Sequence, residues 1–287
     1  MRVLVTEPLS DAGLDLLRRD FQVDVRPELA TGDLAAEIAP YDALVVRSQT
    51  KVSAPVIEAG ENLKVVARAG IGLDNVDVET ATRRGVMVVN APQSNIVSAA
   101  EHTFALLLAQ ARNIPQANAD LKAGRWERSK WQGVELQGKT LGIVGLGRIG
   151  RVVASRARAM GMLIVAYDPF IAPEQARDME IELAPLDEVY ARADFLTVHT
   201  PLTSETRGLV DREAIGKMKK GARIVNCARG GLIDEEALYE ALTSGAIAGA
   251  ALDVFSEEPP PSDHKLLQLE QVIVTPHLGA STREAQE

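Results

Sequence analysis

The chain has 287 residues and a formal net charge of −9, from 31 Lys and Arg against 40 Asp and Glu. This acidic balance argues against a nucleic-acid partner, because neutralising phosphates requires clustered basic side chains. Hydrophobic residues make up 46% of the chain but fall in short runs, and none approaches the roughly 18 consecutive apolar residues of a membrane span. We therefore expect no membrane partner. The N-terminal residues lack a signal-peptide pattern, which predicts a cytoplasmic location.

Short apolar runs alternate with segments of helical period along the chain, a pattern typical of βαβ units and parallel sheets. The first series of predicted strands comprises Arg2–Thr6, Phe21–Val25, Ala43–Val46, Val65–Ala69 and Met87–Val89. The second series comprises Thr140–Val144, Leu163–Tyr167, Phe195–Val198, Arg223–Cys227, Ala248–Leu252 and Val272–Val274. Eleven strands suit two sheets better than one. We predict an α/β fold with two doubly wound parallel-sheet domains.

The longest helical stretch, NIVSAAEHTFALLLAQARNIPQANADLKAG, lies between the two strand series. An Ala-Pro pair precedes it, so we place the domain crossover near residues 90–93. The predicted domains are residues 1–93 and residues 94–280, with residues 281–287 returning to the first.

The cysteine and histidine content limits the possible chemistry. Cys227 is the only cysteine, so neither an internal disulfide nor a thiolate metal cluster is expected. The four histidines lack the spacing of metal ligands, and no metal is predicted. We interpret His102 as a packed helix residue, His199 as a strand-end residue and His264 as solvent-facing.

The segment GKTLGIVGLGRIGRVVASRARAMGMLIVAYDPF reads as a strand, a glycine turn, a helix and a second strand that ends in an acid. Gly145, Gly147 and Gly150 form the pattern G-x-G-x-x-G. The first glycine permits a tight turn, the second lets a pyrophosphate approach the backbone, and the third lets helix and strand pack closely. The helix N-terminus favours anions. This context indicates a dinucleotide site rather than chance glycines in a turn.

Asp168 lies at the end of the second strand, 18 positions past Gly150. It would accept hydrogen bonds from a ribose diol and would repel a 2′-phosphate. No arginine follows it, since the next residues are Pro, Phe and Ile, so NAD is favoured over NADP. The alternative is an exposed acid in a turn before proline.

Polar residues that follow the later strands are candidates for catalysis. Hydride transfer to a keto acid requires a cation for the carboxylate, an acid/base for the carbonyl proton and a group that tunes that base. Arg229 and His277 each follow a predicted strand closely, at the sheet edge where α/β proteins bind ligands. Asp253 and Glu258 lie between them in ALDVFSEEPPP. The alternatives are a surface salt bridge for Arg229 and a loop position facing water for His277.

Five motifs in this order, ARAGIGLDNVD, GLGRIG, NCARGGLIDEEAL, ALDVFSEEPPP and TPHLGAST, resemble those of the D-isomer-specific 2-hydroxyacid dehydrogenase family over essentially the whole chain. The resemblance implies a flavodoxin-like substrate domain, a Rossmann NAD-binding domain and NAD as cofactor. It is strongest to members that oxidise 3-phospho-D-glycerate to 3-phosphohydroxypyruvate, the first step of serine biosynthesis. Alternatives are a glyoxylate or hydroxypyruvate reductase and a dinucleotide-sensing transcriptional corepressor. Longer members carry serine-binding regulatory domains, so we expect this sequence to be part of a longer protein.

The resemblance also implies roles for individual residues. Arg229 would orient the substrate carboxylate, His277 would be the acid/base, and Glu258 would pair with it. An ionised glutamate beside a histidine stabilises the imidazolium, which agrees with these roles. Further implied cofactor contacts are Arg148 and Ile149 at the pyrophosphate, Asp253 at the nicotinamide amide, and Thr200, Cys227, Ala228 and Gly279 along the cofactor cleft. Cys227 could equally be part of the core.

Two arginines suggest a phosphorylated substrate. Arg47 follows the strand ALVV and Arg68 ends LKVVA, so both project from carboxyl ends of strands in the first domain. They are unnecessary for a ligand with one carboxylate that Arg229 already meets, and guanidinium groups suit phosphate oxygens. The resemblance adds Arg128 as a contact from a neighbouring subunit. A surface ion pair is the alternative for each.

The segment GRWERSKWQG carries both tryptophans of the chain between charged residues. Exposed aromatic rings commonly mark contact surfaces. We therefore predict a homodimer or higher homo-oligomer, with the interface formed by the helices after Asn95 and an arm around Gly124–Gly133. The alternative is that both rings pack within their own subunit.

Overall fold

The computed structural model of the protein describes residues 1–286 and forms two compact units. The N-terminal unit contains Met1–Asn95 and Ala280–Glu287, of which residue 287 lies outside the described part. The central unit contains Ile96–Gly279. Each unit is built on its own parallel sheet, so the predicted fold class, two parallel-sheet α/β domains, is confirmed.

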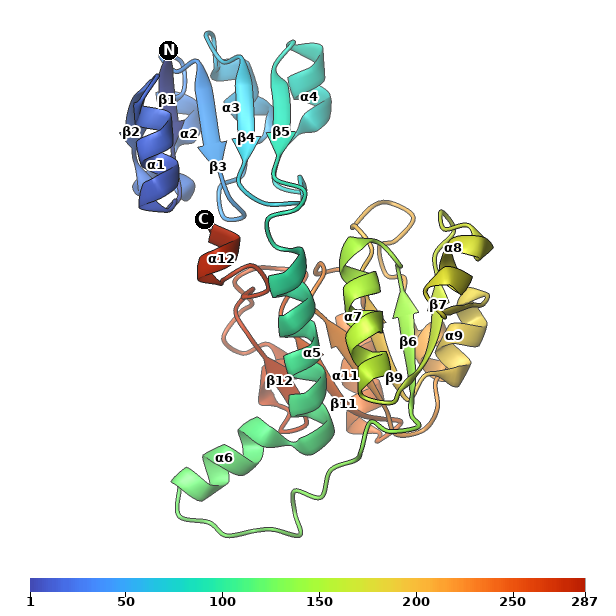
Figure 1. The fold of residues 1–287 in the computed structure, drawn as a ribbon. Coiled ribbons are helices and arrows are strands. Elements are labelled where there is room, and N and C mark those ends of the chain that lie inside the picture. The colour runs from blue at the N-terminus through green and yellow to red at the C-terminus, as the bar shows by residue number, and fades with distance from the viewer. Residues whose placement is uncertain (287) are drawn as a thin grey trace. The chain divides into compact units, whose positions relative to one another are not determined.

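The sheet of the N-terminal unit has the strand order β2-β1-β3-β4-β5, with every neighbouring pair parallel (Figure 1). Its strands are β1 (Arg2–Val5), β2 (Gln22–Val25), β3 (Ala43–Val46), β4 (Val65–Arg68) and β5 (Met87–Asn90). The helices of this unit are α1 (Asp11–Arg18), α2 (Leu34–Glu37), α3 (Ala54–Ala59), α4 (Val78–Arg83) and α12 (Arg283–Gln286), with a 3-10 turn, η1 (Pro27–Ala30).

Alternate residues of each strand in this sheet point to opposite faces, and each face has its own core. Leu4 and Leu44 pack against side chains of α2, α3 and α4. Val3 and Val45 pack on the other face against α1. The β-branched and leucine-rich runs of β1 and β3 therefore form central strands that are buried on both sides.

The central unit has a seven-stranded parallel sheet with the order β12-β11-β10-β9-β6-β7-β8. Its strands are β6 (Thr140–Val144), β7 (Leu163–Tyr167), β8 (Glu182–Leu183), β9 (Phe195–Val198), β10 (Ala222–Asn226), β11 (Ile247–Leu252) and β12 (Val272–Val274). The first strand of this series, β6, pairs with β7 on one side and β9 on the other, so the strand order reverses there. Ligands of doubly wound sheets bind beside such a reversal.

Two helical layers cover the sheet of the central unit. One layer, with α5 (Ile96–Arg112) and α7 (Arg148–Ala159), packs on Leu141 and Ile143. The other packs on Val144 and Leu196 and contains α9 (Leu186–Arg192), α10 (Arg212–Lys217) and α11 (Glu235–Thr243). The remaining elements are α6 (Ile114–Lys122), α8 (Pro173–Asp178) and a 3-10 turn, η2 (Lys265–Gln268).

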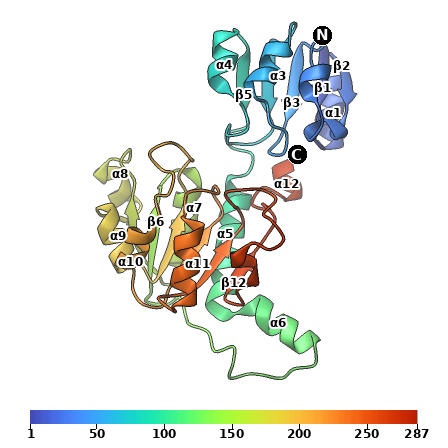
Figure 2. The ribbon, with the colours of Figure 1, turned by 180° about the vertical axis from the view of Figure 1, so that it is seen from behind.

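Helix α6 and the segment that follows it project from the body of the central unit, as Figures 1 and 2 show. The projecting segment, residues 123–133, contains both tryptophans. We refer to residues 123–133 as the arm.

Each of the eleven predicted strands is present with ends within one residue of those predicted, and the structure adds the short strand β8. Within residues 1–286, no helix has both the length and the apolar character needed to cross a bilayer.

Candidate active site

The glycine turn joins β6 to α7 at the point where the strand order reverses. Gly145 has a φ of +96°, and a Cβ there would lie 2.8 Å from the carbonyl of His199. A Cβ on Gly150 would overlap the carbonyl oxygen of Gly145, so the helix can approach the turn only with glycine there. A Cβ on Gly147 would meet nothing within 4 Å. The helix N-terminus therefore faces open space next to Gly147, where a phosphate group would fit.

Asp168 follows β7 directly and is held beside the glycine turn. Its Oδ2 accepts a hydrogen bond from the backbone N–H of Leu146 at 2.7 Å, and its Oδ1 accepts one from Phe170 at 2.9 Å. The side chain remains half-buried rather than enclosed. Since a carboxylate oxygen can accept more than one hydrogen bond, Asp168 can also receive ribose hydroxyl groups.

Thr200 and Cys227, which follow β9 and β10, help to show whether a dinucleotide fits this part of the central unit. The Oγ1 of Thr200 is buried and has no hydrogen-bond partner among the described residues. An orphaned hydroxyl of this kind is satisfied when a polar ligand binds. Cys227 is half-buried, and burial raises the pKa of its thiol to about 12, so it is neutral at physiological pH. The turn, the open space, Asp168 and Thr200 together fit a bound dinucleotide.

His277 and Glu258 are in contact. The Nδ1 of His277 lies 2.7 Å from the Oε2 of Glu258, and the two side chains are 35% and 36% exposed. The other oxygen of Glu258 accepts the backbone N–H of Phe255 at 3.1 Å, which orients the carboxylate. The Nε2 of His277 has no partner within the described part of the chain. This ring nitrogen is available for proton transfer.

Arg229 lies in a turn that packs on the loop carrying Glu258. The buried side chain of Asn226 fixes the turn, since it accepts the N–H of Ala228 at 3.0 Å and donates to the carbonyl of Arg229 at 2.8 Å. A Cβ on Gly230 would overlap the carbonyl oxygen of Phe255. Glycine at this position therefore lets the turn of Arg229 lie against the start of the loop that ends in Glu258.

Arg47 and Arg68 lie at the carboxyl ends of the neighbouring strands β3 and β4 in the N-terminal unit. The backbone around Arg47 is fixed by Glu7, which is only 5% exposed. Its carboxylate accepts the N–H groups of Arg47, Gln49 and Thr50 at 2.8, 3.1 and 2.9 Å. The guanidinium of Arg68 covers Gly70, where a Cβ would overlap its Nη1. Both arginines are half-buried at one edge of this sheet.

The two tryptophans of the arm differ in their exposure to solvent. Trp126 is 76% exposed. Trp131 is half-buried, and its Nε1 donates to the Oδ2 of Asp120 at 2.8 Å. Asp120 also binds the guanidinium of Arg125, so one buried carboxylate ties both ends of the arm to α6. Arg128, between the tryptophans, is exposed.

Asp253 is enclosed by donors from its own unit. Its side chain is 0% exposed and accepts hydrogen bonds from Thr275, the backbone N–H groups of Leu278 and Gly279, and the ring of His102. Burial alone would raise the pKa of the carboxyl, but these hydrogen bonds outweigh it and lower the pKa. A contact between Asp253 and the nicotinamide stays a prediction. The sequence analysis missed His102 as a polar partner, because the contact spans 151 positions.

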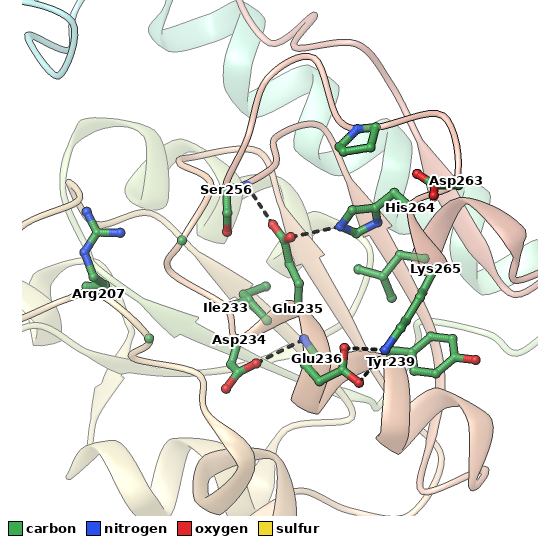
Figure 3. Close-up of a pocket in the computed structure, with 14 residues that line it drawn as sticks. Arg207, Ile233, Asp234, Glu235, Glu236, Tyr239, Ser256, Asp263, His264 and Lys265 are labelled. Carbon is green, nitrogen blue, oxygen red and sulfur yellow. Dashed lines mark hydrogen bonds and ion pairs between the residues drawn. The ribbon is translucent and has the colours of Figure 1, made fainter.

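The prediction that His264 faces solvent is wrong. Its side chain is 21% exposed, its Nε2 lies 3.1 Å from the Oε2 of Glu235, and its ring packs edge-on against Phe255 at 5.4 Å between centroids. It lines a cavity of about 590 Å³ formed with the start of α11 (Figure 3).

His199, at the end of β9, has its Nε2 within hydrogen-bond distance, 3.0 Å, of the hydroxyl of Thr197. Burial lowers the pKa of its imidazole to about 4.

Comparison with known proteins identifies the family. Residues 104–279 match the NAD binding domain of the D-isomer specific 2-hydroxyacid dehydrogenases. The chain belongs to this family, as the five motifs predicted, and the predicted cofactor NAD is confirmed.

Curated relatives carry a more specific name. The D-3-phosphoglycerate dehydrogenase of Methanocaldococcus jannaschii is 55% identical over 288 residues, which cover 100% of this chain and 55% of the relative. The enzyme of that name from Archaeoglobus fulgidus is 51% identical over 287 residues, covering 100% of this chain and 54% of the relative. The chain thus spans about half the length of the curated relatives it matches.

A solved structure shares the fold. The D-lactate dehydrogenase of Aquifex aeolicus, complexed with NAD and lactic acid, superimposes with a TM-score of 0.89 at 26% identity. The match covers 99% of this chain and 90% of that one.

Proposed function

We propose that this chain is the dehydrogenase portion of an enzyme that oxidises 3-phospho-D-glycerate to 3-phosphohydroxypyruvate with NAD. The observation that carries the proposal is the His277–Glu258 pair, 2.7 Å apart, which joins the loops that follow β12 and β11 in the central unit. The names of relatives more than 50% identical support the phosphorylated substrate.

The proposed role of His277 is to accept the proton of the substrate hydroxyl on Nε2 as the carbonyl forms. Glu258 stabilises the resulting imidazolium through Nδ1. A bound NAD would supply the acceptor for the hydride that leaves the substrate carbon. Arg229 holds the carboxylate, which keeps the reacting carbon in one orientation.

The arginines of the N-terminal unit are proposed to recognise the phosphate. Arg47 and Arg68 share one sheet edge, and a charge-assisted pair with phosphate contributes about 1.5–3 kcal/mol. The N-terminal unit would then be the substrate domain and the central unit the dinucleotide domain. Arg128 would be supplied by a neighbouring subunit.

The cofactor contacts are proposed from the glycine turn and the strand ends. Asp168 would bind the adenosine ribose and the start of α7 the pyrophosphate. The full proposed set is Gly145, Gly147, Arg148, Ile149, Gly150, Asp168, Thr200, Cys227, Ala228, Asp253 and Gly279.

We propose a homodimer whose interface includes α5, α6 and the arm. Four apolar side chains on these elements are more than half exposed, which supports a contact surface. They are Val97, Ile114, Leu121 and Trp126, with 57%, 54%, 55% and 76% of their surface exposed. A cytoplasmic location also stays a prediction.

Steady-state NADH production tests the function. The wild-type protein with NAD should turn over 3-phosphoglycerate far faster than glycerate or lactate, and His277→Ala should lose about a hundredfold or more of that rate. Turnover of glyoxylate or hydroxypyruvate with NADH, without activity on phosphoglycerate, would establish the reductase instead. NADH binding without turnover of any hydroxy acid would favour the corepressor.

A further inference from the structure

His277 occupies a backbone conformation that needs support. Its φ is +55°, in the left-handed region that non-glycine residues rarely adopt. Such a conformation persists when the surrounding contacts determine it. The position of its imidazole therefore depends on what holds the turn.

Asp253 holds this turn through three hydrogen bonds, and the carbonyl of Thr275 also accepts from the N–H of His277 at 3.0 Å. The N–H of His277 donates to the backbone carbonyl of Asp253 at 2.9 Å. The N–H of Leu278 donates to its Oδ1 at 2.7 Å and that of Gly279 to its Oδ2 at 2.8 Å. Three successive backbone donors thus end on Asp253, and both carboxylate oxygens must be correctly oriented to receive them.

The orientation of this buried carboxylate is set by side chains. The hydroxyl of Thr275 donates to Oδ1 of Asp253 at 2.6 Å. The Nε2 of His102, on α5, lies 3.1 Å from the same oxygen and 3.0 Å from the hydroxyl oxygen of Thr275. Because that hydroxyl gives its hydrogen to Asp253, its oxygen can only accept from His102. The network therefore assigns the ring hydrogen of His102 to Nε2.

We propose that His102 is a positioning residue for His277, and this rests on the proposed function of His277 in proton transfer. The Nε2–H of His102 fixes Thr275 and the carboxylate of Asp253, whose two oxygens fix the turn of residues 277–279. His102 touches neither substrate nor cofactor in this role. Helix α5 packs against β11 and β12, so it presents the ring to the ends of the two strands that carry Asp253 and Thr275.

Loss of the Nε2–H donor of His102 should impair the positioning of His277 and not the fold. Without His102 the buried Oδ1 of Asp253 keeps Thr275 and Leu278 as donors, so the fold should survive. The carboxylate is no longer locked, and the imidazole of His277 can shift relative to the substrate. Misplacement of a reacting group by about 1 Å can reduce catalysis roughly a hundredfold. The effect should thus fall on kcat.

Two variants of the full-length enzyme separate positioning from packing. His102→Leu has a similar volume but no donor, whereas His102→Gln can place an amide N–H near the original Nε2. Glu101→Gln, on the same helix but exposed, is the matched control. The measurements are kcat and KM for 3-phosphoglycerate, the Kd for NADH from its fluorescence, and the Tm.

We expect His102→Leu to lower kcat by roughly tenfold to a hundredfold. The Kd for NADH should change less than kcat, because among the proposed cofactor contacts only Asp253 touches His102. His102→Gln should recover most of that loss, and Glu101→Gln should behave as the wild type. The pH dependence of the remaining activity in His102→Leu should keep its shape, because the His277–Glu258 pair is intact.

The inference is overturned if His102→Leu retains the wild-type kcat. It is equally overturned if the Leu and Gln variants lose kcat and Tm in parallel, since that marks a packing role alone. The wild-type protein tests the proposed function separately. If it ignores phosphoglycerate but reduces another 2-oxo acid, the substrate proposal fails and the variants are compared on that acid. No turnover of any such acid by the wild type would overturn both.

Discussion

Nδ1 of His277 and Oε2 of Glu258 lie 2.7 Å apart, and the second oxygen of Glu258 is held by the backbone N–H of Phe255. A carboxylate held in this way supports a positive charge on the ring while leaving Nε2 for the substrate. It also favours the ring tautomer that carries its hydrogen on Nδ1, so that Nε2 can accept a proton.

Glu258→Gln should therefore preserve the fold but lower the rate and change the pH–rate profile. The imidazolium that forms on His277 loses its stabilising carboxylate in this variant, so proton transfer to Nε2 becomes less favourable. His277→Ala should lose about a hundredfold or more of the rate, with NADH binding near normal. The measurements are kcat/KM against pH and NADH fluorescence titration. Unchanged rates and profiles in both variants would remove the acid/base assignment.

Cofactor choice should depend on Asp168. The wild type should strongly prefer NAD, because the carboxylate at the end of β7 accepts ribose hydroxyl groups and repels a 2′-phosphate. Asp168→Asn retains an acceptor for the N–H of Leu146 but loses the charge. This variant should weaken the binding of NAD by roughly tenfold to a hundredfold, as expected for one charged hydrogen bond. It should also reduce the preference for NAD over NADP. Comparable kcat/KM for both cofactors in the wild type would contradict this account.

Much of the fold could be predicted from the sequence because the central strands of both sheets are buried on both faces and are therefore rich in valine, isoleucine and leucine. The exception, β8, consists of Glu182 and Leu183 only and carries no such pattern. It forms because it can pair with the edge of β7, which is a tertiary contact.

The candidate site likewise contains residues that a local sequence pattern predicts and residues that only tertiary contacts reveal. The glycine turn and Asp168 have local patterns with a fixed spacing. Glu7 and His102 have none, since their partners lie about 40 and 151 positions away. The local sequence of His264 also resembles that of a solvent-exposed loop, and only the fold brings Glu235 and Phe255 to it.

Phosphate recognition can be tested with Arg47→Ala and Arg68→Ala. Each should raise KM for 3-phosphoglycerate by roughly tenfold to a hundredfold, the equivalent of one charge-assisted pair. Turnover of an unphosphorylated 2-hydroxy acid should change little. Arg83→Ala, at an exposed ion pair on α4, is the matched control. If both substrate types are lost equally, or if the wild type uses glycerate as well as the phosphorylated acid, the phosphate assignment is wrong.

Stability should depend on pH through His199. Its pKa is lowered to about 4 by burial, whereas an unfolded histidine titrates near 6.5. The unfolded state therefore binds more protons between these values, and the folded state is destabilised as pH falls from about 6.5 to about 4. The full loss is on the order of 3 kcal/mol. Urea unfolding at several pH values should show a smaller loss in His199→Asn, and equal losses in both proteins would contradict the assignment.

The oligomeric state can be tested at Trp126. Its ring is 76% exposed on the arm, and burying it in an interface should contribute about 1.5–3 kcal/mol. Sedimentation velocity at micromolar concentration should give a dimer for the wild type, and Trp126→Ser should raise the dissociation constant by roughly tenfold to a hundredfold. Phe170→Ser removes a ring that is 92% exposed on another part of the central unit and should leave the mass unchanged. A monomeric wild type would exclude the dimer. Equal dissociation by both variants would show that the arm is not the contact, because general loss of surface apolar area would then explain the effect.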